Sequence, residues 1–126
     1  MLEAAGFADR VAKRLRVSPD WNTQSFCLKG AIALEEKSTR LVFDVDHGDI
    51  SVRDTSIGAT GRVTITGASS GWRRLGDPAA INATLNRLFR EGDLDLEGDM
   101  DFAFHHWSEL FWLIEAVRAE LVDSVA

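Results

Sequence analysis

The stretch VTITGASSGWRRLGDP, residues 63–78, decides the fold of this chain. It begins with alternating apolar and polar side chains, which predict a half-buried strand that the first glycine ends. The two serines that follow can cap a short helix, and this helix carries Trp72 and Leu75. Asp77 and Pro78 predict the start of a further helix, because proline is favoured at the first helical position after a capping aspartate.

A second stretch, LNRLFREGDLDLEGD at residues 85–99, completes this pattern. The helix predicted from Asp77 ends at Gly92, because glycine readily takes the left-handed conformation that follows a last helical turn. Leu94 and Leu96 alternate with acidic residues, so DLDLEGD predicts another short strand. The apolar face of the helix before it consists of Ile81, Leu85, Leu88 and Phe89.

Towards the amino terminus, three more segments alternate with a period of two. They are residues 25–35, 41–46 and 50–52, and polar turns separate them. Together with residues 62–66 they predict four short strands joined in an antiparallel meander. One face of the first strand carries Phe26, Leu28, Gly30, Ile32 and Leu34.

An amphipathic helix is predicted at the start of the sequence. Residues 2–16 place Phe7, Val11 and Leu15 at i, i+4 and i+8, and Pro19 lies beyond the end of this helix.

A second long helix is predicted over residues 100–122, and its apolar arc is unusually wide. A helix this apolar is either nearly enclosed by the protein or lines something other than protein. Trp112 interrupts the polar face. The middle of the apolar arc carries Ala103, Phe104, Trp107, Leu110, Phe111, Ile114, Val117 and Leu121. The opposite face carries Asp101, His105, Ser108, Glu109, Glu115 and Ala119.

Length and composition narrow the class of protein. The 126 residues, 45% hydrophobic and 27% charged, predict one globular domain over residues 1–126. A net charge of -6 argues against a nucleic-acid partner, and the short apolar runs argue against stable membrane insertion. With a single cysteine, Cys27, and no apolar signal core near the amino terminus, we expect a cytoplasmic location.

Several polar motifs match parts of known sites without completing one. DLDLEGDMDFAF, residues 93–104, has the acids and glycine of a calcium loop but ends in Phe104 instead of the bidentate glutamate. His105, His106 and Glu109 form an HHxxE motif, yet the sequence offers no third ligand. An acidic cluster at a predicted turn can act in acid–base catalysis only within a pocket. That cluster consists of Asp44, Asp46, His47 and Asp49. We therefore predict no catalytic residue, no metal and no cofactor.

Aromatic side chains are the remaining signal. The chain has seven Phe and four Trp but no Tyr, and many of these rings fall in the last two helices. This apolar surface fits either a large aromatic core or a cavity for an apolar ligand. His106 points to the apolar side of its helix, so it is either a satisfied core histidine or a polar contact within such a cavity.

The order of these elements resembles the sterol carrier protein type-two domain, the SCP-like sterol-binding family. A helix, four strands, two helices, a strand closed by Gly-Asp and a long apolar helix are similar to that family over nearly the whole chain. The residues that carry the resemblance are Val63, Ile65, Gly67, Trp72, Leu75, Gly92, Leu94, Leu96, Gly98 and Asp99.

The resemblance implies an α+β fold in which helices cover a five-stranded, mainly antiparallel sheet and enclose an apolar tunnel. Members of the family bind sterols, fatty acids or acyl-CoA. The aromatic FAFHHW segment after Gly98-Asp99 departs from the family, so the ligand need not be a sterol. The final Ser-Val-Ala is not a peroxisomal targeting tripeptide. The ligand-binding residues expected here are Trp72, Ile81, Leu85, Phe89, Phe102, Phe104, His106, Trp107, Phe111 and Ile114.

From these features we expect a domain that binds or carries a small apolar ligand, alone or as an accessory unit, and that is not an enzyme. Two alternatives stay open. One is a cone-shaped α+β enzyme of the isomerase or hydratase kind, although such folds usually finish with strands rather than a helix. The other is an interaction domain that buries the last helix against a partner, which leaves a homodimer open.

Overall fold

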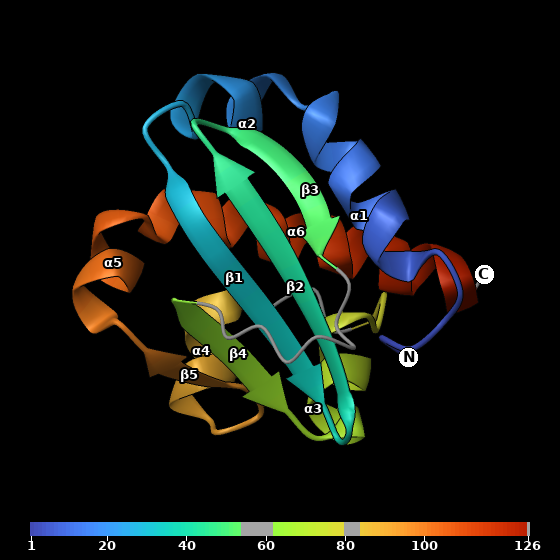
Figure 1. The fold of residues 1–126 in the computed structure, drawn as a ribbon. Helices are drawn as coiled ribbons and strands as arrows, with labels where there is room; N and C mark the ends of the chain where they lie inside the picture. Colours follow the sequence, from blue (N-terminus) through green and yellow to red (C-terminus); the bar gives the residue numbers. More distant parts are fainter. Residues whose placement is uncertain (54–61, 80–83, 126) are drawn as a thin grey trace.

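The computed structural model of this protein describes residues 1–53, 62–79 and 84–125. Within these ranges, five strands form one sheet in the order β3-β2-β1-β4-β5 (Figure 1). The strands are β1 (Lys29–Glu36), β2 (Thr39–Asp46), β3 (Asp49–Arg53), β4 (Val63–Gly67) and β5 (Asp95–Gly98). The helices are α1 (Phe7–Arg16), α2 (Pro19–Gln24), α3 (Ser69–Leu75), α4 (Leu85–Arg90), α5 (Met100–His105) and α6 (Trp107–Val125).

The sheet is mixed, with one parallel pair among antiparallel ones. β1, β2 and β3 form the predicted meander, but β4 pairs with β1 in parallel, so the predicted fourth step of the meander is wrong. Parallel neighbours need a connection longer than a hairpin, and residues 37–62, which include β2 and β3, connect β1 to β4. β5 pairs with β4 in the antiparallel sense. The predicted α+β class and mainly antiparallel sheet are confirmed.

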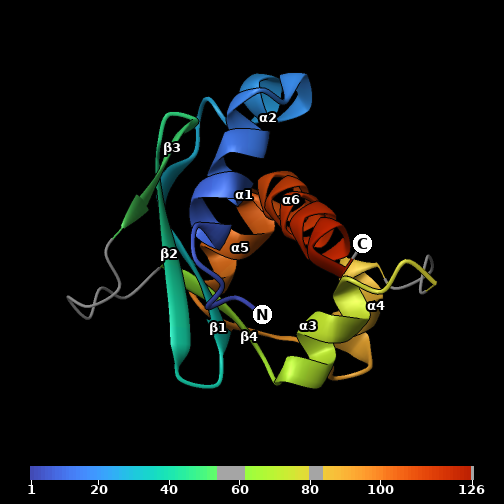
Figure 2. The same ribbon diagram turned by 90° about the vertical axis from the view of Figure 1, so that its right-hand side faces the viewer.

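The described helices lie on one side of the sheet (Figure 2). Ile32 and Leu34 of β1 pair with Phe43 and Leu41 of β2, and these side chains belong to the core beneath the helices. Their neighbours in sequence point to the other face, because side chains alternate along a strand. The apolar and polar residues that alternate in the sequence of β1 and β2 therefore lie on the helix-covered face and on the outer face of the sheet, in turn.

The beginning of β1 differs from the prediction. The strand starts at Lys29 rather than near Ser25, because Ser25 ends α2 and its carbonyl accepts a hydrogen bond from the Leu28 amide at 2.8 Å. Phe26 and Cys27 lie in this turn and are exposed, so their alternation with Leu28 does not reflect a strand. Similarly, α1 begins at Phe7 rather than at residue 2.

The helix predicted to start at Asp77 starts later. The Asp77 carboxylate accepts a hydrogen bond from the Ala79 amide at 2.9 Å, which closes a turn instead of capping a helix. α4 begins at Leu85, after Thr84 with its extended backbone and capping hydroxyl. Residues 80–83, part of the predicted helix, lie outside the described residues.

The long helix predicted over residues 100–122 is two helices. α5 and α6 are separated at His106, where φ is −111° and ψ is 32°. α5 and α6 run in different directions from this point (Figure 1). Phe102 of α5 and Leu110 of α6, one on each side of the break, are both buried.

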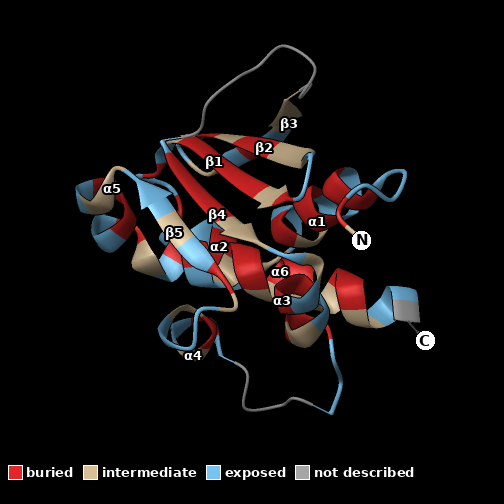
Figure 3. Ribbon diagram, turned by 90° about the horizontal axis from the view of Figure 1, so that it is seen from below, coloured by how far each residue is buried: buried red, intermediate tan, exposed pale blue. Residues whose placement is uncertain are grey.

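α6 forms the centre of the helical layer. In Figure 3 the buried residues run along β1 and β4 and along much of α6. α1 packs beside α6 and contributes Phe7, Val11 and Leu15 to the same core. The buried residues of α6 include Leu110, Leu113, Ile114, Ala116, Val117 and Leu121.

Gly71 explains why glycine occurs in the GASSG segment. A Cβ at this position would lie 2.1 Å from the carbonyl oxygen of Asp93, so α3 approaches the chain before β5 more closely than a side chain allows. Gly92 is a contrasting case, because its φ is 81° but nothing stands within 4 Å of a Cβ built there.

We predict that Gly71→Ala lowers the free energy of unfolding by about 3 kcal/mol, because backbone must move to admit the methyl group. Gly92→Ala has space and should lose about 1 kcal/mol through its left-handed backbone alone. Urea unfolding followed by tryptophan fluorescence measures both. Equal losses in the two variants would contradict the close contact between α3 and Asp93.

Candidate functional site

Five of the predicted ligand-binding residues lie inside the layer between the sheet and the helices. Trp72 and Ile114 are fully buried, and Leu85, Phe102 and His106 are nearly so. The Trp72 indole nitrogen donates to the Glu35 carbonyl at 2.9 Å, which fixes its ring against the end of β1. Side chains pack closely here, and an apolar tunnel stays a prediction.

Four other predicted residues lie at the surface, and we call them the aromatic patch: Phe89, Phe104 and Trp107, whose rings are neighbours, and Phe111, which follows Trp107 by one turn of α6 and lies 5.3 Å from the Trp112 ring, centroid to centroid. The Trp107 ring lies 5.9 Å from the Phe89 ring and 6.1 Å from the Phe104 ring, centroid to centroid. Phe104 is 69% exposed and Phe111 is 39% exposed, whereas Phe89 and Trp107 are half-buried against the core. The tenth predicted residue, Ile81, lies outside the described residues.

A hollow of about 350 Å³ opens next to the aromatic patch. Phe111 belongs to both, because it stands on α6 opposite the segment that leads into α4. Arg118 of α6 donates to the Leu75 carbonyl at 2.9 Å and so ties α6 to the end of α3 beside this hollow. The residues that line this hollow are Asp77, Pro78, Thr84, Phe111, Glu115, Arg118 and Val122.

His106 and Glu109 form a buried polar pair at the break between α5 and α6. His106 Nδ1 lies 3.4 Å from Glu109 Oε1, and both side chains are about 10% exposed. Glu109 is thus buried, and its predicted place on the polar face of one long helix is wrong because the helix breaks before it. His105 is exposed instead of joining this pair. Among the described residues, no group of three or more His, Cys, Asp or Glu side chains is placed to hold a metal ion.

Arg62 connects α5 to the sheet and was not singled out from the sequence. Its guanidinium carbon lies 4.4 Å above the Phe102 ring centroid, and its Nη2 lies 2.7 Å from the Asp99 carboxylate. Asp99 also accepts a hydrogen bond from the Phe102 amide at 3.1 Å and so caps α5. The Phe102 amide and the Arg62 guanidinium together hold the pKa of Asp99 below its usual value.

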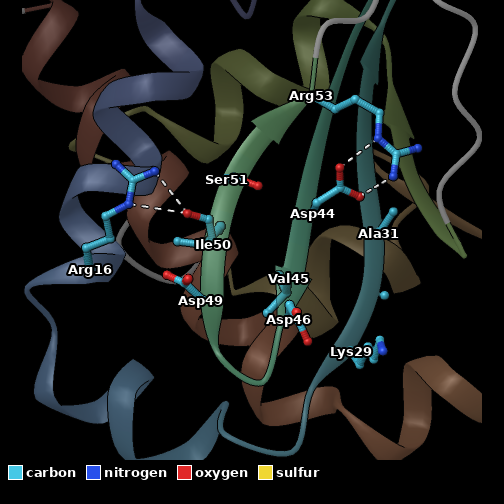
Figure 4. A pocket seen from close by; sticks show the side chains of 11 residues that line it. Arg16, Lys29, Ala31, Asp44, Val45, Asp46, Asp49, Ile50, Ser51 and Arg53 are labelled. Atoms are coloured by element: carbon cyan, nitrogen blue, oxygen red, sulfur yellow. Dashed lines mark hydrogen bonds and ion pairs between the residues drawn. The ribbon is translucent and has the colours of Figure 1, made fainter.

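The outer face of the sheet carries a larger and more polar hollow of about 560 Å³ (Figure 4). Asp44, Asp46 and Asp49 of the predicted acidic cluster line it, and Arg53 donates to both oxygens of the Asp44 carboxylate. His47 is not in the lining; it lies in the turn between β2 and β3, 2.6 Å from Asp46. Such a charged and open lining does not suit an apolar ligand.

Trp112 has a partner within the chain. Its indole nitrogen donates to the Gln24 side-chain carbonyl at 3.0 Å, which attaches α2 to α6.

Glu36 is a buried residue that the sequence reasoning missed. The predicted strand ended at residue 35, one residue too early. Extended by one residue, the alternation would have placed Glu36 on the buried face with Ile32 and Leu34.

A family model matches much of the chain. The model of the SCP-2 sterol transfer family matches residues 26–109, which is more than half of the chain. The chain therefore belongs to the SCP-2 sterol transfer family, a family associated with lipid binding and transfer. No curated protein matches it. In the described ranges, no helix is both long and apolar enough to cross a membrane.

Solved structures share the fold. A conserved hypothetical protein of Thermus thermophilus, described as possibly a sterol carrier protein, has a TM-score of 0.72 at 15% identity, over 95% of this chain and 90% of its own. A sterol carrier protein 2 crystal structure has a TM-score of 0.70 at 18% identity, over 90% and 94%. The ubiquinone synthesis protein UbiJ-SCP2 has a TM-score of 0.57 at 21% identity, over 94% and 91%. This shared fold is not the cone-type fold of the enzyme alternative.

We predict a pH dependence for the contribution of Asp99. A carboxylate with a lowered pKa stabilises the fold above its ordinary pKa, and this stability is lost as the pH falls through the lowered value. Asp99→Asn should therefore melt below the wild type at pH 7, and the difference should shrink as the solution is acidified to about pH 2.

Melting temperatures from about pH 2 to pH 7, followed by circular dichroism, measure this difference. Asp101→Asn serves as the control, because Asp101 lies in the same turn but makes no ion pair with Arg62. A difference for Asp99→Asn that stays constant with pH would contradict the assignment.

Proposed function

We propose that this chain binds a small apolar ligand of the lipid, fatty acyl or isoprenoid kind between its sheet and helices α3 to α6, and carries it without transforming it chemically. The observation that carries this proposal is the continuity between the aromatic patch and the buried layer. Phe104 lies in solvent, Trp107 is half-buried beside it, and Phe102 lies in the core two residues before Phe104. Membership of the SCP-2 family supports the same function.

The physical driving force would be removal of apolar surface from water. Burial of such surface contributes about 25 cal/mol per Å², and an apolar chain lying over Phe104 and Phe111 would cover rings that water now contacts. The hollow beside Phe111 lies along α6 and faces Asp77, Pro78 and Thr84, so it offers such a chain further surface next to the exposed rings. We place the mouth of the ligand site there, with the predicted inner residues Trp72, Leu85 and Ile114 as its walls. The proposed carrier is a single cytoplasmic domain.

The exposed rings also favour one alternative, a protein-interaction domain. Phe104 at 69% exposure would suit a partner protein or a second copy of this chain. The two functions differ in what the purified protein contains, since a carrier holds a small molecule and an interaction domain does not.

We predict that native mass spectrometry of freshly purified protein finds a small apolar molecule bound, and that denaturing extraction releases it. The physical reason is that an apolar molecule lying against the aromatic patch removes its own apolar surface and the exposed rings from water. A clean apo mass with no uptake of fatty acid, acyl-CoA or sterol would instead point to the interaction domain.

We further predict that Trp107→Ala and Phe111→Ala each weaken binding of a fluorescent fatty acid roughly tenfold, because each removes an aromatic contact surface. Both side chains are partly exposed, so both variants should stay folded by circular dichroism. Phe26→Ala is the matched control, because Phe26 is 65% exposed and lies in the turn before β1. Equal binding by all three variants and the wild type would remove the aromatic patch from the site.

A further inference from the structure

Glu36 is a carboxylate inside the apolar layer. It is the last residue of β1 and follows Ile32 and Leu34 on the face that the helices cover, with its side chain only 3% exposed. Charged side chains are rarely buried unless every polar atom has a partner, because leaving water costs them solvation.

The two oxygens of this carboxylate differ in their partners. Oε1 accepts a hydrogen bond from the Leu2 amide at 2.9 Å and lies 3.2 Å from the Met1 amino nitrogen. Oε2 is buried and has no hydrogen-bond partner among the described residues. A buried acceptor without a donor is costly, so a molecule that supplies a donor at this point gains free energy from binding.

Glu36 stands at the end of β1 where Trp72, a proposed wall of the ligand site, is held. Trp72 donates its indole hydrogen to Glu35, the residue before Glu36, and Gly67 of β4 pairs with Glu36. Figure 2 shows the amino-terminal segment at this end, between the sheet and α3.

The aromatic patch lies towards the other end. The Phe102 ring packs against Gly30 at the start of β1, and Phe102 is followed by Phe104 and Trp107. Gly30 and Glu36 are six residues apart on an extended strand, which spans about 20 Å. The layer therefore has an aromatic end and an end with a free carboxylate oxygen.

We propose that Glu36 anchors the polar head of the ligand and selects heads that donate a hydrogen bond, such as an alcohol or an ammonium group, over carboxylates. The inference rests on the proposed carrier function. The ligand would lie with its head at Glu36 and its apolar tail towards the aromatic patch. The Met1 ammonium already pairs with Glu36 Oε1 and with Glu3, so a carboxylate head at Oε2 would bring a second acceptor, with like charge, to an oxygen that lacks a donor. Sites built to bind a donor discriminate strongly against analogues that lack it.

The test compares three ligands of equal chain length: 1-hexadecanol, hexadecylamine and hexadecanoate. Each displaces a fluorescent lipid probe from the wild type at pH 7 in a titration. We expect the alcohol and the amine to bind at least roughly tenfold more tightly than the acid. Glu36→Gln keeps an oxygen for the Leu2 amide but offers an N–H in place of the free oxygen. This variant should lose the preference and bind the acid about tenfold better than the wild type does.

Glu97→Gln is the matched control. Glu97 is exposed on β5, where it pairs with Thr64 and lies away from the amino-terminal segment, so its variant should keep the wild-type preference. A preference that survives in Glu36→Gln would overturn the anchor while leaving the carrier function standing. If Glu36→Gln does not fold, the affinities of the three ligands for the wild type decide the test. Binding of hexadecanoate as tightly as the alcohol and the amine, or more tightly, would overturn the proposal. Failure of every ligand and of the probe itself to bind would overturn the carrier function with it.

Discussion

The structure depends on the burial of α6, which is too apolar for the sheet to cover alone. A sheet can shield one side of a helix, and the remaining apolar surface needs further elements. α1 covers one flank, and Arg14 on it pairs with Glu120 of α6 at 2.9 Å. α2 is attached through Trp112 and Gln24, and α3 through Arg118 and the Leu75 carbonyl. The short helices α2 and α3 thus bury parts of the α6 surface that the sheet does not contact.

This cover is incomplete where α6 begins, and the proposed function follows from that gap. At the start of α6, Trp107 contacts Phe89 of α4 and Phe104 of α5, and the rings of Phe104 and Phe111 are left in contact with water. At the far end of β1, by contrast, the layer is closed by the amino-terminal segment lying over Glu36. A layer with exposed aromatic rings at one end and a buried carboxylate at the other would suit the proposed ligand, a molecule with a tail and a head.

Much of this fold could be predicted from the sequence, because each strand has one buried face and therefore an alternating pattern. β2, β3, β4 and β5 lie within two residues of their predicted bounds. The partner of β4 could not be predicted, since alternation says which face is buried and not which strand lies beside it. The break at His106 could not be predicted either, because the same apolar pattern is compatible with one long helix and with two shorter ones. Glu36 was missed for a simpler reason, since the predicted strand stopped at Glu35.

The parallel pairing of β1 with β4, beneath a helix that comes last in the chain, also has a consequence for synthesis on the ribosome. The first three strands emerge early, but their inner face has no cover from α6 until residues 107–125 have left the exit tunnel. Contacts between such distant segments form slowly, because a long loop must close first. During translation the nascent meander therefore exposes an apolar face, and it is at this stage that we expect chaperones to engage the chain.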